Sequence, residues 1–334
     1  MGDDMKTAIG YDTQMSQVGQ QAYSGRLTAE GVSKVGPVSV KEMQTAKDVI
    51  EKSRAAAPTA KRLASTGKRV FVMRHGERLD RLFPSWATLA FNTMGEYKPF
   101  DLNMPLQLPA RSNQHRAMQS DPPLTEVGFV TSQMVGRAFS LTGVKIAHVF
   151  SSPALRCLHS AKALLKTACP TQPGMRVKVE PGLFEFLGWY KDGCPQFLTG
   201  AEMNNMRCPA DPAYSPIMPA SSLIPLAGQE TVAQYYERSD KVIKAIVEKC
   251  PEKSGIVIVG HAPSLDALPR PLLAKKKLPE GDDMQRMGLR YPYCSVAIVE
   301  ETVENTWQLA STALPPISYM HYTNRIDFEY FNRE

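Results

Sequence analysis

The sequence is poor in cysteine, and the few cysteines that it has are not paired. Six of them are spread over 334 residues without any CxxC spacing: Cys157, Cys169, Cys194, Cys208, Cys250 and Cys294. A disulfide framework or a structural zinc site requires closely spaced cysteines, so the spacing argues against both. We expect reduced thiols and a cytoplasmic protein.

Features of membrane proteins are also missing. No apolar run approaches the roughly 20 residues of a membrane-spanning helix. The amino terminus lacks the charged and then apolar layout of a secretory signal. It begins MGDDMK, with the Met-Gly of a myristoylation site, but Lys6 stands where that site requires serine or threonine. We therefore expect no membrane association.

Charge of one sign is not in large excess. Lysine and arginine number 39 against 33 acidic residues, which gives a net charge of +6, and 43% of the residues are hydrophobic. This is an ordinary globular composition, and the excess is too small to indicate nucleic-acid binding. It would favour an anionic substrate if it were focused in a cleft, and otherwise describes a mildly basic surface.

Large apolar side chains are rare in the first 66 residues, which are rich in Gly, Ser, Thr, Gln and Ala. One stretch, VKEMQTAKDVIEKSRAAA, could form a short helix with Val40, Met43, Val49 and Ile50 on one face. The AAAPTAKRLASTGKR that overlaps its end is typical of a linker. We expect residues 1–66 to be a flexible arm and residues 67–334 to form one domain.

From Lys68 onward, buried strands alternate with amphipathic helices. Strands are predicted in RVFVM, IAHVFSSP, RVKVEPGLFE and GIVIVGH, and YCSVAIVEET with TWQLAST would close the sheet as a hairpin edge. Helices are predicted after Thr125, after Pro153 and over 229–249. The Pro-rich segment 191–227 is expected to be a loop, part of a lid. The alternation predicts an α/β domain with a mostly parallel sheet in three layers.

The helix after Thr125 is expected to place a regular set of apolar side chains on one face. That set is Val127, Val130, Met134, Val135 and Ala138. The helix opened by Pro153 carries a similar stripe, consisting of Leu155, Leu158, Ala161 and Leu165.

Basic side chains and histidines follow three of the predicted strands. Arg74 and His75 end the first strand. Arg156 follows the second strand through a turn, and His261 ends the fourth. Because the carboxyl ends of parallel strands lie along one edge of a sheet, we expect these side chains to meet in one pocket, joined by Arg78.

Such a grouping suits a phosphoryl group. Planar, always-charged arginines bind phosphoryl oxygens in bidentate fashion, and transfer of the group needs mainly positioning and electrostatic stabilisation. A neutral imidazole can act as the in-line nucleophile and form a phosphohistidine. Gly76 would let the backbone approach the phosphate closely. Singly, each feature has a commoner explanation, such as a structural histidine or a surface arginine, but their joint placement favours a phosphate pocket.

The motifs resemble those of the histidine phosphatase superfamily, which includes phosphoglycerate mutases and acid phosphatases. The RHG after the first strand, the later SSPALR and the GH after a core strand all match. Seven segments in order resemble the phosphatase domain of the Sts/TULA proteins, suppressors of T-cell-receptor signalling, and the related ecdysteroid-phosphate phosphatases: RHGERLD, NMPLQLP, DPPLTEVG, SSPALRC, EPGLFEFLGW, HAPSLDA and YCSVAIVEE. The resemblance covers about residues 68–334 and implies a phosphoglycerate mutase-like α/β/α fold.

The resemblance also implies a role for each residue of the pocket. His75 is the nucleophile that becomes phosphorylated, and His261 is the second imidazole at the phosphoryl oxygens. The phosphate clamp consists of Arg74, Arg78 and Arg156.

Glu185, in LFEF, resembles the acid/base of the family, which protonates the leaving oxygen and then activates water. From the sequence alone, a solvated loop carboxylate is an equal alternative. The segment after the second histidine is HAPS rather than HD, so the acid of the acid-phosphatase type is absent there, which favours Glu185.

Two departures from the Sts/TULA pattern stand out. Nothing before Lys68 resembles a ubiquitin-associated or Src-homology module, so a role in ubiquitin-linked signalling does not carry over. Phe186 stands where tryptophan is expected, which alters the pocket wall rather than the chemistry. Four aromatic residues near the motifs could form a wall for a flat leaving group, or else be core residues: Phe83, Trp86, Trp189 and Tyr190.

We therefore expect a phosphatase for phosphotyrosine proteins or for bulky aromatic or steroid phosphates. The alternatives are a mutase of the phosphoglycerate type and a weakly catalytic module that binds phosphorylated ligands. No metal or other cofactor is expected, because three arginines beside two histidines would repel a divalent cation. The YCSVAIVEE strand, taken as an edge, could support a homodimer by sheet extension, and cover by a loop is an equal alternative.

Overall fold

The computed structural model describes residues 63–111, 114–168, 174–280, 282–310, 314–319 and 322–333. The chain divides into two units, Met1–Lys61 and Arg62–Glu334, and all described residues belong to the second. The short helix predicted around Val40 to Ile50 lies outside the described residues, as does most of the predicted arm.

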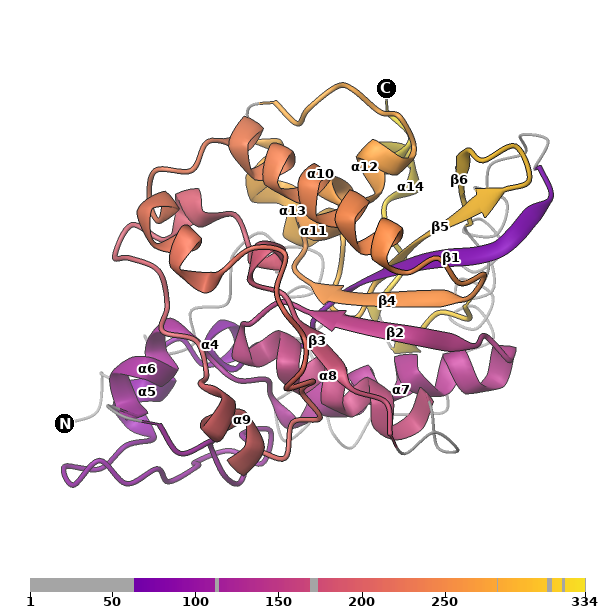
Figure 1. Cartoon of the computed structure of the whole chain (residues 1–334). Helices are drawn as coiled ribbons and strands as arrows, with labels where there is room; N and C mark the ends of the chain where they lie inside the picture. Colours follow the sequence, from indigo (N-terminus) through magenta and orange to yellow (C-terminus); the bar gives the residue numbers. More distant parts are fainter. Residues whose placement is uncertain are drawn as a thin grey trace, which may run out of the picture. The chain divides into compact units, whose positions relative to one another are not determined.

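A six-stranded sheet forms the centre of the second unit (Figure 1). Its spatial order is β3 (Val177–Val179), β2 (Ile146–Ser151), β4 (Gly255–Gly260), β1 (Ser65–Arg74), β5 (Val296–Thr302) and β6 (Trp307–Leu309). The first four are parallel to one another, and β5 pairs antiparallel with both β1 and β6. The mostly parallel sheet predicted from the sequence is confirmed.

Strand β1 is continuously apolar from Val70 to Met73 because both of its faces are covered there. Val70 and Val72 pack into one core cluster, whereas Phe71 and Met73 pack into another, and none of the four is more than 1% exposed. Successive residues of a strand point to opposite faces, so each cluster receives every second side chain.

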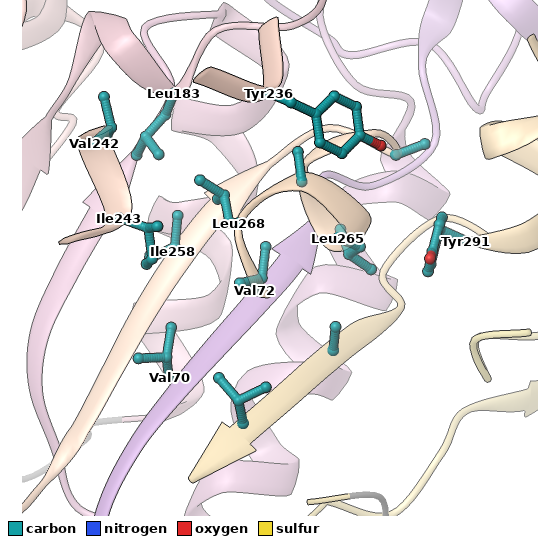
Figure 2. Close-up of a cluster of buried hydrophobic side chains, with 14 of the residues drawn as sticks. Val70, Val72, Leu183, Tyr236, Val242, Ile243, Ile258, Leu265, Leu268 and Tyr291 are labelled. Atoms are coloured by element: carbon teal, nitrogen blue, oxygen red, sulfur yellow. The ribbon is translucent and has the colours of Figure 1, made fainter. Parts of the chain in front are cut away.

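Helices cover the two faces of the sheet in separate layers. One layer contains α7 (Glu126–Thr142) and α8 (Leu155–Ala168) (Figure 1). The other contains α10 (Val232–Lys249), α11 (Ser264–Ala267), α12 (Pro269–Leu272) and α13 (Asp283–Arg290). Figure 2 shows Val70, Val72 and Ile258 of the sheet beside Ile243 of α10 and Leu265 of α11. The three-layer α/β/α prediction is confirmed.

Helix α7 begins where the sequence predicts, but the predicted buried face is partly wrong. Thr125 caps it by accepting a hydrogen bond from the Gly128 backbone N–H over 3.0 Å. Val135 and Ala138 are buried as predicted. Three other members of the predicted face are about half exposed: Val127, Val130 and Met134.

Small residues explain this offset. A Cβ atom at Gly136 of α7 would lie 2.2 Å from the carbonyl oxygen of Leu164 in α8, so the two helices approach each other closely at this position. Apolar periodicity does not predict such a contact, because glycine is not counted among the apolar residues that define the face.

The Pro-rich segment 191–227 is predicted to be a loop, and this prediction is partly wrong. The segment contains two short helical pieces. They are α9 (Gly200–Asn205) and the 3-10 helix η3 (Ala220–Leu226). The buried carboxylate of Glu180 fastens the segment, because it accepts hydrogen bonds from the hydroxyl of Tyr214 and from the backbone of Ile217 and Met218.

Short elements complete the unit: α4 (Leu79–Leu82), α5 (Trp86–Leu89), α6 (Gln114–Ser120), η1 (Pro181–Leu183), η2 (Leu187–Trp189), β7 (Ser318–Tyr319), β8 (Tyr322–Thr323) and α14 (Phe328–Phe331). Within the described part of the chain, no helix combines the length and apolar character needed to cross a bilayer. The predicted hairpin of β5 and β6 is present, but β5 lies between β1 and β6 and is not an edge. Sheet extension through β5 is therefore blocked.

Candidate active site

The carboxyl ends of three parallel strands lie side by side. Arg74, at the end of β1, is in register with Gly260, at the end of β4. The backbone N–H of His75 donates to the carbonyl of Gly260 over 3.0 Å, and that of Ser152 donates to the carbonyl of Val259 over 2.9 Å. The residues after β1, β2 and β4 thus emerge at one point of the sheet edge, as the topology rule requires.

The His75 imidazole is buried and its protonation is determined by its contacts. Nδ1 lies 2.8 Å from the carbonyl oxygen of Gly76. A carbonyl only accepts hydrogen bonds, so Nδ1 carries the proton and Nε2 keeps a free lone pair. Burial, followed by Arg156 and His261, lowers the pKa of His75 well below its usual value, so the ring is neutral at physiological pH.

His261 lies beside His75, with 5.5 Å between the ring centroids. Its Nδ1 is 3.2 Å from Nη2 of Arg156, and its Nε2 is 2.8 Å from Oγ of Ser152. Arginine can only donate, so Nδ1 is unprotonated and Nε2 carries the proton that is donated to Ser152. Burial and then Arg156 lower the pKa of this imidazole well below its usual value.

Arg156 is fully buried, although an arginine in the first turn of a helix would usually be at the surface. Its Nη2 donates to Oε2 of Glu185 over 2.8 Å, and Nη1 lies 3.7 Å from a carboxylate oxygen of Asp121. Asp121 also accepts a hydrogen bond from the backbone N–H of Leu155 at the start of α8. The carboxylate therefore contacts both the guanidinium of Arg156 and the first turn of the helix that carries it. Within the described residues, Nε and Nη1 of Arg156 have no hydrogen-bond acceptor.

The other two predicted clamp arginines are held by neighbours. Arg74 donates from Nη1 to the carbonyls of Gly288 and Tyr291, and its guanidinium carbon lies 4.0 Å from the centroid of the Tyr293 ring. Arg78 forms two hydrogen bonds to the carboxylate of Asp80, of 2.9 and 2.7 Å. Both guanidiniums belong to the charged surroundings of His75, because each lowers the pKa of that imidazole.

Glu185 lies at the same place rather than in solvent. It is 7% exposed and follows η1, which continues directly from the end of β3. Its Oε2 accepts from Arg156 and from the hydroxyl of Tyr190, each over 2.8 Å, and its Oε1 is 3.9 Å from Nδ1 of His261. Burial would raise the pKa of this carboxyl, but the charges of Arg156 and Arg78 outweigh it and lower the pKa to about 2.

A second buried ion pair holds the backbone around Glu185. Arg238 of α10 donates to the carboxylate of Glu230 and to the carbonyls of Gly182, Phe184 and Glu185. The carboxylate of Glu230 also accepts from the backbone N–H of Leu187 over 2.7 Å. The turn that carries the predicted acid/base is thus fixed on both sides of Glu185.

Gly76 has a structural role besides the predicted close approach to phosphate, which stays a prediction. A Cβ atom there would lie 2.4 Å from the carbonyl oxygen of Gly128 in α7, so the absence of a side chain allows the strand end to contact the helix. In turn, a Cβ at Gly128 would lie 2.6 Å from the carbonyl oxygen of Glu77. The pair of glycines sets how closely the His75 segment approaches α7.

The predicted aromatic wall divides into core and surface. Trp86 is 1% exposed within a core cluster, so the alternative interpretation as a core residue is confirmed for it. Trp189 is 41% exposed and packs against Phe186, with 5.4 Å between the ring centroids. Phe83 is partly buried against Phe100. The hydroxyl of Tyr190 contacts the site, because it donates a hydrogen bond to Glu185.

The sequence did not predict several residues of the site. Each of them contacts and positions one of the predicted site residues or the backbone beside it. They are Ser152, Asp121, Glu230, Arg238 and Tyr293. Ser152 and Asp121 belong to the SSPALRC and DPPLTEVG motifs, so their presence in these motifs was a signal that could have identified them. Arg238 gave no signal, because a single arginine in an amphipathic helix is ordinary. Over the described ranges, no group of three or more His, Cys, Asp or Glu side chains is arranged to hold a metal ion.

Comparison with known proteins shows where this arrangement belongs. The family model of the histidine phosphatase superfamily (branch 1) matches residues 109–313. The ecdysteroid-phosphate phosphatase of Drosophila melanogaster is 35% identical over 253 residues, which are 75% of this chain and 33% of that protein. Ubiquitin-associated and SH3 domain-containing protein A of mouse is 35% identical over 264 residues, 77% of this chain and 41% of that protein. The chain thus spans between a third and about two-fifths of these relatives.

A solved structure covers the chain more fully. The ecdysone phosphate phosphatase of Bombyx mori, in complex with tungstate, superposes with a TM-score of 0.66 at 30% identity, over 79% of this chain and 99% of that one. The resemblance found in the motifs is confirmed by all three comparisons. The chain belongs to the histidine phosphatase superfamily.

Proposed function

We propose that this chain is a metal-independent phosphatase that hydrolyses phosphomonoesters through a phosphohistidine at His75. The observation that carries the proposal is the unprotonated Nε2 of a neutral, buried imidazole, fixed by the hydrogen bond of Nδ1 to Gly76 and surrounded by guanidiniums. A lone pair in an electropositive pocket is what in-line attack on a phosphoryl group requires.

The reaction has two steps. In the first, Nε2 of His75 attacks phosphorus, the bond to the ester oxygen breaks, and the carboxyl of Glu185 gives its proton to the leaving oxygen. In the second, Glu185 accepts a proton from water, the oxygen of which attacks the phosphohistidine and releases inorganic phosphate. Arg74, Arg78 and Arg156 stabilise the equatorial oxygens in both steps.

The low pKa of Glu185 sets a condition on the first step. At a pKa of about 2 the carboxyl is ionised at neutral pH and cannot donate a proton. A phosphate ester adds negative charge beside it and competes for the N–H groups of Arg156, and both effects raise the pKa of Glu185. Substrate binding thus converts the carboxylate into the acid that the substrate needs.

The proposed leaving group is bulky and apolar, either the tyrosine of a phosphoprotein or an aromatic or steroid alcohol. Tyr293 supports this choice, because its ring centroid lies 5.7 Å from that of His75. Trp189 offers further apolar surface. The Drosophila and silkworm relatives are named for ecdysteroid and ecdysone phosphates. The five described cysteines are free thiols, which supports action in a reducing compartment such as the cytoplasm.

The test is a comparison of the wild type with His75→Ala on four esters: an aryl phosphate, a phosphotyrosine peptide, a steroid phosphate and phosphoglycerate. We expect phosphate release by the wild type, an acid-labile phosphoenzyme and no turnover by the variant. Full activity of His75→Ala would refute the proposal. Phosphopeptide binding without release would identify a binding module, and transfer to a second hydroxyl that depends on a bisphosphate primer would identify a mutase.

A further inference from the structure

We propose that Tyr190 is a positioning residue for the acid/base: its hydroxyl holds Glu185 by one oxygen, so that the other oxygen exchanges the proton. The inference rests on the proposed function, because it requires Glu185 to exchange protons with the leaving group and with water. It assigns a role to a side chain that the sequence motifs present only as an aromatic ring beside the pocket.

The hydroxyl of Tyr190 contacts both partners of the central ion pair. It donates to Oε2 of Glu185 over 2.8 Å and accepts from Nη2 of Arg156 over 3.1 Å. The tyrosine itself is fixed from two sides. Its backbone N–H donates to the carbonyl of Leu187 over 3.0 Å, and its ring packs on Phe184 with 5.1 Å between the centroids.

The two oxygens of the Glu185 carboxylate are therefore not equivalent. Oε2 accepts two hydrogen bonds, from Tyr190 and Arg156. No described residue donates a hydrogen bond to Oε1, which lies 3.9 Å from Nδ1 of His261, on the side of the paired imidazoles. A carboxylate held by one oxygen presents the other in a defined direction, and proton transfer depends strongly on that direction.

Tyr190 keeps its proton under all working conditions. Burial, followed by the negative charge of Glu185, raises the pKa of its phenol well above the usual value, so the hydroxyl is a permanent donor. Arg156 is different, since its N–H groups must also serve the phosphate. When they turn toward phosphoryl oxygens, the hydroxyl of Tyr190 is the donor that stays on Oε2. Tyr190 thus positions the carboxylate of Glu185, and Arg156 is left to bind the phosphate.

The experiment uses Tyr190→Phe, which removes the hydroxyl and keeps the ring. The rate constant of phosphoenzyme formation is measured by rapid quench at saturating phenyl phosphate and 4-nitrophenyl phosphate. Phenoxide is a poor leaving group that needs a proton, whereas 4-nitrophenoxide departs without one. We expect the rate with phenyl phosphate to fall about tenfold, the worth of one hydrogen bond to a charged group, while the rate with 4-nitrophenyl phosphate stays close to wild type.

The pH profile gives a second readout. Loss of a donor to the ionised carboxylate raises the pKa of Glu185, so the basic limb of the phenyl phosphate profile should move to higher pH. An equal loss for both esters would mean a merely structural role and would overturn the inference, as would no loss or an unmoved limb. Retained reaction with 4-nitrophenyl phosphate shows that the variant is folded.

Tyr214→Phe is the matched control. The hydroxyl of Tyr214 also donates to a buried glutamate, Glu180, over 2.7 Å, but that carboxylate anchors the segment around Ile217 rather than the site. The ratio of the two ester rates should be unchanged in this variant. A wild type that forms no phosphoenzyme overturns the proposed function and the inference together. A phosphoenzyme that needs His75, combined with a wild-type ratio in Tyr190→Phe, overturns the inference alone.

Discussion

Nη2 of Arg156 donates a hydrogen bond to Oε2 of Glu185 over 2.8 Å, so the proposed phosphate clamp and the proposed acid/base form a buried ion pair. A buried charge left without its partner is costly, so each of the two restrains the other. In the proposed reaction, a phosphate ester would offer the arginine a better partner and leave the carboxylate to take a proton. The pair would thus couple substrate binding to protonation of Glu185.

Replacement of Glu185 by glutamine tests this coupling. The variant keeps the shape and an acceptor but cannot exchange a proton, so kcat for phenyl phosphate should fall by about 100-fold or more. Arg156 no longer faces a competing negative charge, and inorganic phosphate should inhibit the variant more tightly than the wild type. Steady-state kinetics with phosphate as inhibitor measures both. Glu280→Gln, at an exposed site, is the control, and wild-type kcat in Glu185→Gln would exclude the acid/base role.

Arg238→Lys tests the support behind Glu185. The guanidinium donates five hydrogen bonds of 2.8–3.2 Å, to the carboxylate of Glu230 and to three carbonyls of the turn over 182–185. An ammonium cannot serve all of these acceptors, so we expect about 3 kcal/mol less stability in urea unfolding. We also expect a lower kcat, because the carboxylate is no longer fixed. Arg137→Lys, on the exposed side of α7, should change neither quantity.

Gly76→Ala should prevent the normal approach of the His75 segment to α7. The added Cβ would meet the carbonyl oxygen of Gly128 at 2.4 Å, and neither backbone can yield without moving its element. We expect a loss of about 3 kcal/mol or more in the free energy of unfolding, together with lost activity. Gly200→Ala is the contrast, since nothing lies within 4 Å of a Cβ there. Located at the start of α9, it should be neutral or slightly stabilising, and equal effects of the two changes would contradict the packing argument.

His159 makes stability depend on pH at a distance from the site. Burial, followed by Lys162, lowers its pKa to about 3. The folded protein therefore leaves it neutral between pH 6.5 and about 3, whereas the unfolded chain protonates it below pH 6.5. The unfolded state binds more protons in this window, so stability falls as the pH falls, by about 1.4 kcal/mol per pH unit for this residue.

The His159→Leu variant removes this pH-dependent contribution to the free energy of unfolding. Urea unfolding at a series of pH values between 7 and 4 should give a shallower decline than in the wild type. The buried His75 and His261 remain in the variant and retain their own contributions in the same direction. Identical slopes in the two proteins would show that His159 is not responsible.

Much of the fold followed from local pattern. The apolar run from Val70 to Met73 lies in β1, and the run that ends at Gly260 forms β4, because strand segments buried on both faces must be apolar. The burial of Arg156 could not be read in the same way. It depends on Asp121 and Glu185, which lie 35 and 29 residues away in the sequence (156 − 121 and 185 − 156).

Two predictions are wrong for different reasons. The face of α7 that carries large apolar residues is predicted as buried, whereas the close contact with α8 is made at Gly136, and periodicity does not specify which helix packs where. The strand after Cys294 is predicted as an edge, although its hairpin with TWQLAST is predicted from the same sequence. That hairpin is present, so β6 pairs beyond β5 and the edge prediction is wrong.

The sequence by itself determined the α/β/α class and the edge of the sheet at which Arg74, His75, Arg156 and His261 gather, because strand periodicity and the geometry of parallel sheets are local rules. Only the tertiary structure decided which nitrogen of His75 is free, and that Glu185 is shared by Arg156 and Tyr190. Protonation and ion pairing depend on distances of about 3 Å between groups from separate elements, and such distances exist only after the layers have packed.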